Sequence, residues 1–160
     1  MTVYRRAFGF GTRFTPYKLS SDEEWREFRK NGIGGSDVAA IMGISPYRTA
    51  LDVWLEKTGR KEPADLSDNE AVYWGTVNEA NVAKRFAEDH QDFEVSRVNA
   101  TLVLNEDTVL MANLDRAVVD DSGEPAVLEI KTASAYKASD WAKGVPDYYL
   151  TQVTHYLLVT

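Results

Sequence analysis

Three acidic residues and a lysine occupy positions where charged side chains are uncommon. Glu79 lies in the middle of the apolar face of a predicted helix, and Asp115 interrupts the apolar run VLMANLDRAVV. Glu129 and Lys131 share one face of the short strand predicted over LEIKT, because side chains alternate along a strand. A buried carboxylate is costly unless it is paired or binds a metal. Each residue alone fits an ordinary ion pair, but together they indicate a site that carries chemistry.

The predicted strands bring these acids together. Asp115 and Glu129 lie on consecutive strands joined by a turn at Asp120–Gly123, so antiparallel pairing places position 115 opposite position 128 or 129. Two carboxylates on neighbouring strands, with a third on a packed helix, repel each other unless a cation joins them. Carboxylate oxygens are ligands that Mg²⁺ and Mn²⁺ prefer. We therefore expect a site for Mg²⁺ or Mn²⁺, where Lys131 assists an attacking water or stabilises charge on phosphorus.

Composition narrows the chemistry further. The chain has no cysteine and two histidines, which excludes thiolate zinc sites, cysteine-held iron–sulfur clusters, a cysteine nucleophile and a histidine-rich metal centre. Its net charge of −7 argues against a simple nucleic-acid coat protein. Residues 1–18 hold four basic and no acidic side chains, whereas the rest of the chain holds 14 basic and 25 acidic ones. This basic N-terminal arm fits either a solvated tail or an arm that contacts phosphates.

Periodicity and turn signals predict a single α/β (α+β) domain over residues 19–160, with one sheet. Helices are expected at about 22–30, 37–42, 49–57, 69–89 and 148–160, and strands at 93–104, 109–119 and 126–132. Residues 133–147 are expected to form a loop. The chain ends inside the apolar run HYLLVT, so we expect the native sequence to continue or the last strand to be missing. Without a membrane-length apolar run or a secretion signal, the expected location is cytoplasmic.

Two further features leave alternatives open. Tyr47 follows the break at Ser45-Pro46 and either stacks on a nucleobase or packs on its own loop. The basic cluster of Lys57, Arg60 and Lys61 either contacts a duplex backbone or is solvated.

The acidic residues also resemble a known signature. Asp115, followed after a hairpin by Glu129-Ile130-Lys131, resembles the PD-(D/E)xK nuclease motif, and Glu79 in WGTVNEANVAKRFAED resembles the helical acid of that superfamily. The segment NGIGGSDVAAIMGISPYRTALDVWLEKTGR resembles the opening of the YqaJ-like viral recombinases, the group that includes phage lambda exonuclease. The resemblance covers roughly residues 25–158. It implies a PD-(D/E)xK nuclease core with a central mixed sheet flanked by helices.

The resemblance assigns the catalytic roles residue by residue. It implies that Glu79, Asp115 and Glu129 bind two Mg²⁺ (or Mn²⁺) ions together with the backbone carbonyl of Ile130. It also implies that Lys131 is the catalytic lysine.

A second group of residues is implied to hold the DNA end. Arg29 and Ser36 match residues that bind the 5′-terminal phosphate, and Gln152 matches a glutamine in the helix after the catalytic strand. Asn113 stands where the family has a phosphate-binding serine and keeps a hydrogen-bond donor. Arg116 replaces a glycine, so it either adds a phosphate contact or blocks one.

These assignments imply an exonuclease that resects double-stranded DNA from 5′ to 3′ for phage-type recombination, in the cytoplasm of a bacterial or phage-infected cell. The expected partners are double-stranded DNA ends, a phage single-strand annealing protein and further copies of the chain in a trimer, with no membrane. One alternative is a non-catalytic or truncated nuclease-fold protein that binds DNA ends or a recombination partner. Another is an endonuclease of the same superfamily. Arg29 and Ser36 favour the exonuclease, because an endonuclease has no terminal phosphate to hold.

Overall fold

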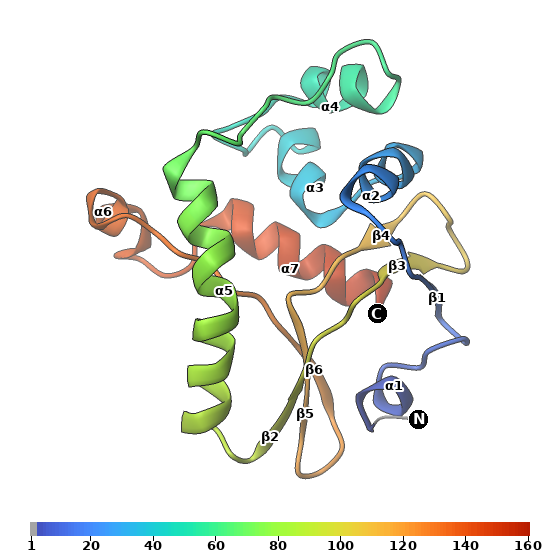
Figure 1. Cartoon of the computed structure of the whole chain (residues 1–160), viewed down its shortest axis with the longest axis vertical. Coiled ribbons are helices and arrows are strands. Elements are labelled where there is room, and N and C mark those ends of the chain that lie inside the picture. Colours follow the sequence, from blue (N-terminus) through green and yellow to red (C-terminus); the bar gives the residue numbers. More distant parts are fainter. Residues whose placement is uncertain (1–2) are drawn as a thin grey trace. The chain divides into compact units, whose positions relative to one another are not determined.

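Two interleaved sets of segments make up the computed structural model, which describes residues 3–160 (Figure 1). The first unit contains residues 3–7, 64–98 and 114–146. The second unit contains residues 8–63, 99–113 and 147–160. Each unit has its own three-stranded antiparallel sheet, so each can position a site of its own.

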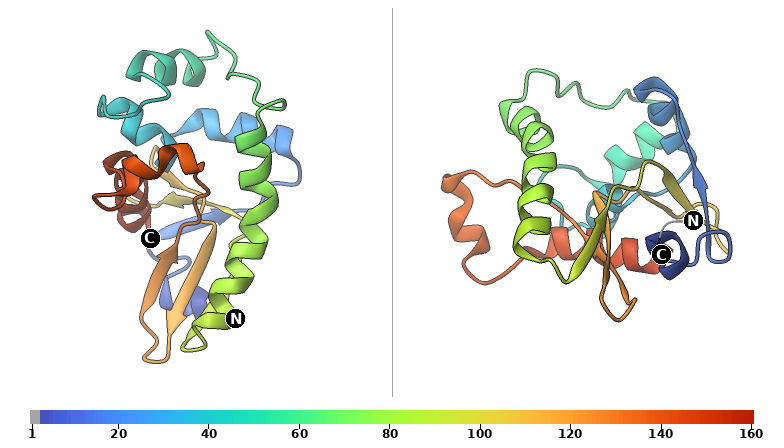
Figure 2. Two further views of the ribbon diagram at one scale, coloured as in Figure 1. Left: turned by 90° about the vertical axis from the view of Figure 1, so that its left-hand side faces the viewer. Right: turned by 60° about the horizontal axis from the view of Figure 1, so that its bottom comes forward.

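The first unit combines a long helix with a hairpin (Figure 2). Helix α5 (Glu70–Asp89) begins where the side chain of Asn69 accepts hydrogen bonds from backbone N–H groups of the first turn. Strand β2 (Phe93–Ser96) follows the helix and pairs with β5 (Arg116–Asp120), which in turn pairs with β6 (Pro125–Leu128). The sheet therefore has the order β2-β5-β6, with α5 joined to its edge strand.

The turn between β5 and β6 fixes the register on which the site depends. Asp120 Oδ1 accepts hydrogen bonds from the backbone N–H groups of Ser122 and Glu124. Gly123 has a φ of +89°, which glycine adopts without strain. The resulting pairing places Arg116 opposite Leu128. The unit also contains α1 (Val3–Ala7), which packs against β5, and the short helices η2 (Ala135–Lys137) and α6 (Ala138–Trp141).

In the second unit, helices pack on a sheet of order β1-β3-β4. Its strands are β1 (Phe14–Tyr17), β3 (Thr101–Leu104) and β4 (Met111–Ala112). Its helices are α2 (Asp22–Phe28), η1 (Arg29–Asn31), α3 (Gly35–Ile41), α4 (Ala50–Lys57) and α7 (Asp147–Val159). Phe14, Leu102 and Val159 are completely buried in its core. Helix α7 packs against α3, β3 and β4, so it forms the centre of this unit.

The expected α+β class is confirmed, and the helices expected at 49–57, 69–89 and 148–160 are α4, α5 and α7. The strands differ from the expected single mixed sheet, because they form two antiparallel sheets. Each long apolar run, 93–104 and 109–119, contributes one strand to each sheet. Polar residues lie between the two strands of each run, and one of them, Asn113, accepts a hydrogen bond from Thr101 through its side chain.

Two local features differ from what the sequence led us to expect. Part of the expected N-terminal arm is structured, since β1 pairs with β3 and Arg13 donates to the carbonyl of Leu158. The division into an arm over 1–18 and one domain over 19–160 stays a prediction. The segment expected as a loop, 133–147, contains η2 and α6. Within residues 3–160, no helix is both long enough and apolar enough to cross a membrane.

Candidate functional site

In the first unit, Asp115 and Glu129 lie at facing positions of the hairpin. Asp115 immediately precedes β5 and Glu129 immediately follows β6, so they extend the pairing of Arg116 with Leu128 by one position. Asp115 Oδ2 accepts a hydrogen bond of 2.8 Å from the backbone N–H of Ile130. Asp115 and Glu129 therefore lie close together, as expected.

Glu79, on α5, lies near the start of β5 and pairs there with Arg116. It lies on the inward side of that helix with buried Ala83 and half-buried Phe86. This inward stripe is narrower than the expected apolar face, because Val72 and Val82 are exposed. The Oε1 atom of Glu79 is 2.6 Å from Nη1 of the buried Arg116, which also donates to the carbonyl of Asp115. Glu79 thus forms an ion pair within the cluster.

Lys131 completes the acidic cluster. Its Nζ atom lies 2.5 Å from Oε1 of Glu129, and the Glu129 side chain is almost fully buried. The lysine side chain is more accessible, at 28% exposure. The predicted acid and lysine of LEIKT therefore form an ion pair at the end of β6, where the ammonium group can still meet a substrate.

The surroundings of the Asp115 and Glu129 carboxyl groups favour the binding of a cation. Burial raises the pKa of Asp115, and the charge of Glu79 raises it further, although Ile130 and Lys131 act in the other direction. Burial also raises the pKa of Glu129 to about 7 against the lowering effect of Lys131, and Asp115 contributes to the rise. Both carboxyl groups are thus held in surroundings that disfavour their ionised forms. A divalent cation among them would relieve this cost.

The donor types suit a hard cation, but the side chains are engaged in ion pairs. Within residues 3–160, no three acidic or histidine side chains are already arranged as a ligand set. Arg116 and Lys131 supply the positive charges that meet Glu79 and Glu129. Carboxylates of this number and kind fit Mg²⁺ or Mn²⁺. An ion bound by Glu79 would compete with Arg116 for its carboxylate.

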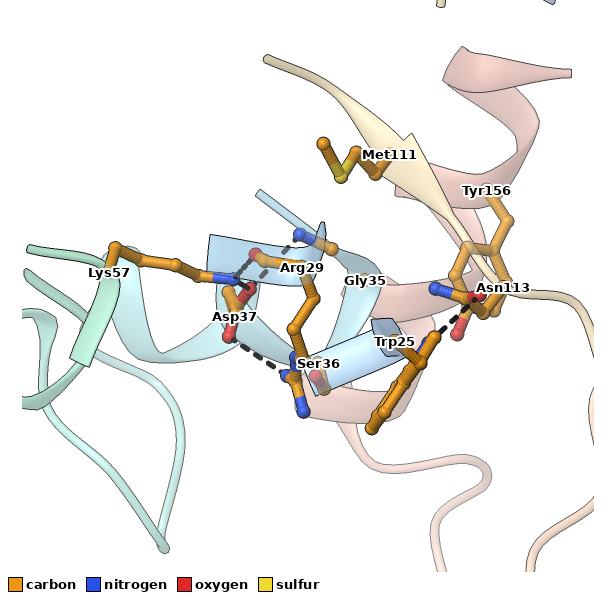
Figure 3. Close-up of a pocket in the computed structure, with 10 residues that line it drawn as sticks. Trp25, Arg29, Gly35, Ser36, Asp37, Lys57, Met111, Asn113 and Tyr156 are labelled. Atoms are coloured by element: carbon orange, nitrogen blue, oxygen red, sulfur yellow. Dashed lines mark hydrogen bonds and ion pairs between the residues drawn. The ribbon is translucent and has the colours of Figure 1, made fainter. Parts of the chain in front are cut away.

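In the second unit, three of the four residues expected at the DNA end, Arg29, Ser36 and Asn113, line a cavity of about 120 Å³ (Figure 3). Its full lining consists of Trp25, Arg29, Gly34, Gly35, Ser36, Asp37, Lys57, Met111, Asn113 and Tyr156. Pockets for drug-sized ligands occupy roughly 300–1,000 Å³. This cavity is smaller and suits a group of the size of a phosphate.

A completely buried carboxylate organises the cations at this pocket. Asp37 is 0% exposed, and its oxygens lie 2.7 Å from Lys57 Nζ, 3.1 Å from Arg48 Nη1 and 3.8 Å from Arg29 Nη2. Lys57 also donates to the carbonyl of Arg29, over 2.7 Å. Arg48 in turn pairs with Glu56. Three cations thus meet two carboxylates, which leaves one net positive charge for an anion.

The charge state of Asp37 follows from these contacts. Burial acts to raise its pKa, but the hydrogen bond and charge of Lys57, the backbone N–H of Gly34 and the charge of Arg29 outweigh it and lower the pKa below its ordinary value. For Lys57, burial lowers the pKa and Asp37 opposes this effect. Asp37 is therefore ionised at neutral pH and holds the cations in place.

The opposite wall of the pocket is built by close packing of α3 against α7. A Cβ atom on Gly35 would lie 2.5 Å from Cε1 of Tyr156 and 2.9 Å from Cγ of Gln152, so only glycine fits there. Gln152 is buried and donates to the hydroxyl of Tyr156, over 2.7 Å. Gln152 therefore stands behind Tyr156 rather than in the lining, and its contact with DNA stays a prediction.

Asn113 presents a donor to the pocket. Its Oδ1 atom accepts hydrogen bonds from Thr101 Oγ1 at 2.8 Å and from Trp25 Nε1 at 3.4 Å. Because both contacts use Oδ1, the amide NH₂ remains as a donor on the pocket side (Figure 3).

The sequence did not reveal the roles of Lys57 and Asp37 in this pocket. Lys57 was grouped with Arg60 and Lys61 as a basic cluster that either contacts DNA or is solvated. The helix expected to begin at residue 37 begins two residues earlier, at Gly35, so Ser36 lies in its first turn, and the Asp37 carboxylate accepts a hydrogen bond from the N–H of the N-cap residue Gly34. The signal for Asp37 was an acid three residues after a glycine at the start of an apolar helix, which is equally typical of a simple cap.

Comparison with known proteins identifies the family. Residues 24–160 match the YqaJ-like viral recombinase domain. A curated relative, an uncharacterized protein YqaJ of Bacillus subtilis (strain 168), is 42% identical over 138 residues, which cover 86% of this chain. The matched region is 42% of the relative, so the chain spans about two fifths of that protein's length. The chain belongs to the YqaJ-like viral recombinase family, which confirms the resemblance and supports a recombination-related nuclease in general terms.

Proposed function

We propose that this member of the YqaJ-like viral recombinase family is a metal-dependent exonuclease that resects double-stranded DNA from a 5′-phosphorylated end. The observation that carries the proposal is the small cationic pocket lined by Arg29, Ser36 and Asn113, in a chain that also contains an acid–lysine cluster. A pocket sized for one phosphate group is useful to an enzyme that begins at a strand terminus. The resulting 3′ overhang is the substrate needed for strand annealing.

In this proposal, Glu79, Asp115, Glu129 and the Ile130 carbonyl hold two Mg²⁺ or Mn²⁺ ions. When bound, the ions supply Lewis-acid polarisation of the phosphodiester and a water of lowered pKa. Asp115 is held by the Ile130 N–H, which fixes the orientation of its carboxylate. The ammonium of Lys131 stabilises the negative charge that develops on the reacting phosphate or orients the attacking water.

The pocket residues set the polarity of the reaction. The guanidinium of Arg29 and the ammonium of Lys57 supply charge, while Ser36 and the Asn113 amide supply hydrogen bonds. Asn113 and Asp115 are two residues apart in the sequence, so a single residue connects the pocket residue to the acid.

The trimeric assembly and the cooperation with a phage single-strand annealing protein rest on family resemblance alone. The proposal also keeps the expected cytoplasmic location. An endonuclease is disfavoured, because it would have no use for a terminal-phosphate pocket. A non-catalytic DNA-end-binding protein is disfavoured because Glu79, Asp115, Glu129 and Lys131 are all present.

Digestion of matched substrates tests the proposal. Linear duplex with 5′-phosphate ends, the same duplex with 5′-hydroxyl ends and a closed circle are incubated with Mg²⁺, and products are followed over time. We expect rapid loss of the phosphorylated linear duplex, slower loss of the hydroxyl form and an intact circle, with no digestion by Asp115→Asn. Cleavage of the circle at the linear rate would support the endonuclease instead. Absence of digestion with retained end binding would support the non-catalytic alternative.

A further inference from the structure

Three tyrosines from distant parts of the sequence gather in the second unit. Tyr47 lies in the loop between α3 and α4, and Tyr148 and Tyr149 lie in the first turn of α7. The ring centroids of Tyr47 and Tyr148 are 5.9 Å apart at 88°, and those of Tyr148 and Tyr149 are 4.4 Å apart at 53°. Tyr47 is nevertheless 66% exposed, so only part of its ring is used in packing.

Hydrogen bonds anchor the backbone of the loop that carries the exposed ring. The hydroxyl of Ser45 accepts hydrogen bonds from the backbone N–H groups of Tyr47 and Arg48, at 3.2 and 3.3 Å. The side chain of Arg48 is tied to the buried Asp37 and to Glu56. A ring on an anchored backbone that also packs against Tyr148 loses less entropy than a freely rotating side chain when a flat ligand stacks on it. The exposed part of the Tyr47 ring is therefore available for stacking.

This aromatic surface is linked to the phosphate pocket by two connections within the unit. Through Arg48, the loop bonds to Asp37, which lines the pocket. Along α7, Tyr148, Gln152 and Tyr156 follow at intervals of four residues and so share one face of the helix, and Tyr156 lines the pocket. The backbone positions of Tyr148 and Tyr156 are about 12 Å apart along the helix axis. Three or four stacked nucleotides, at about 3.4 Å each, have the same length, so we take the first few nucleotides as candidates for contact with Tyr47.

We propose that Tyr47, supported by Tyr148, is a stacking platform for an unpaired nucleobase near the 5′ end of the DNA strand. The proposal rests on the proposed function, because it takes the pocket as the site of the terminal phosphate. Aromatic side chains stack on every base, since every base has a π face. The pocket would then recognise the phosphate without sequence preference, and Tyr47 would hold the adjacent strand in an unpaired conformation.

A binding experiment with short single strands tests the platform. The probe is a 5′-phosphorylated oligonucleotide with 2-aminopurine at one of positions 2 to 4, in EDTA so that no cleavage occurs. Stacking on Tyr47 quenches the fluorescence, and anisotropy gives the affinity. We expect Tyr47→Ala to lose the quenching at one position and to bind about 5- to 150-fold more weakly, whereas Tyr47→Phe retains both. An abasic residue at the same position should remove the difference between Tyr47→Ala and the parent.

Two controls separate this proposal from its alternatives. Leu51→Ala changes a neighbouring side chain of similar exposure, 62%, and should bind like the parent. Unchanged binding and quenching in Tyr47→Ala would overturn the platform, and the exposed ring would then belong to a protein contact. An equal loss in Leu51→Ala would also overturn it. The 5′-hydroxyl form of the oligonucleotide tests the pocket separately. Equal affinity for the two ends, with a persisting Tyr47 effect, would refute the phosphate site and keep the platform.

Discussion

Lys57 Nζ lies 2.7 Å from a carboxylate oxygen of Asp37 and donates to the backbone carbonyl of Arg29. A single ammonium group therefore joins the buried acid to η1, the element that carries Arg29. Because Lys57 also lines the pocket, it contributes charge as well as position.

Removing this ammonium should weaken recognition of the phosphate. We expect Lys57→Met to bind 5′-phosphorylated DNA ends about tenfold more weakly, in keeping with one charged hydrogen bond, while affinity for 5′-hydroxyl ends changes little. Lys61→Met is the matched control, because Lys61 pairs with Asp52 and is half exposed. Fluorescence anisotropy at one fixed salt concentration measures the affinity for both kinds of DNA end. An equal loss of affinity for the two kinds of end, or an equally large loss in Lys61→Met, would contradict the role of Lys57.

The buried acid should show a characteristic dependence of stability on pH. Because the pKa of Asp37 is lower in the folded protein than its ordinary value, its ionisation stabilises the fold above about pH 4, and this contribution is lost as pH falls through the folded pKa. We expect Asp37→Asn to reduce the free energy of unfolding by about 3 kcal/mol at pH 7 and by less at pH 3. Urea unfolding at the two pH values measures this difference. A destabilisation by Asp37→Asn that is larger at pH 3 than at pH 7 would show that the pKa of Asp37 is not lowered by folding.

Arg116 should compete with metal for Glu79. Its guanidinium lies 2.6 Å from the Glu79 carboxylate and is almost fully buried. Arg116→Met should therefore lower the free energy of unfolding by about 3 kcal/mol, because it breaks a buried ion pair. It should also raise the Mg²⁺ affinity several-fold, because Mg²⁺ no longer has to displace the guanidinium from Glu79. Arg85→Met, on the exposed face of the same helix as Glu79, serves as the control. Calorimetric titration with Mg²⁺ gives the affinities, and a weaker Mg²⁺ affinity in folded Arg116→Met would refute the competition.

Lys131 should matter for turnover more than for metal binding. Lys131→Ala retains Glu79, Asp115 and Glu129, so Mg²⁺ should still bind. We expect the initial rate of digestion to fall by about two to four orders of magnitude, the range for one acid–base or electrostatic group. Lys137→Ala, in the exposed segment after the cluster, should digest DNA at the parent rate. Loss of Mg²⁺ binding together with activity in Lys131→Ala would indicate that the lysine holds the structure instead.

The sequence predicted the helices and the hairpin well, because their signals are local. Asn69 and Thr49 are strong helix caps, and Asp120 and Gly123 define the turn that sets Asp115 opposite Glu129. The division of strands between two sheets was not predictable from apolar runs, because it depends on where polar side chains such as Asn113 find distant partners. The role of Lys57 was not predictable for the same reason, because its contacts are with α3 and η1, which are distant in sequence.

We propose that this chain cleaves DNA and selects the 5′-phosphorylated end through Arg29. The initial rate of Mg²⁺-dependent digestion is measured on 5′-phosphate and 5′-hydroxyl duplexes for the parent, for Arg29→Ala and for Arg26→Ala, a control on the preceding helix α2. We expect a clear preference for the phosphorylated end in the parent and in Arg26→Ala. We expect Arg29→Ala to lose this preference while metal-dependent cleavage remains, since a guanidinium matches phosphate oxygens in a way other side chains do not. Equal rates on both ends in the parent, or an unchanged preference in Arg29→Ala, would show that Arg29 does not select the end.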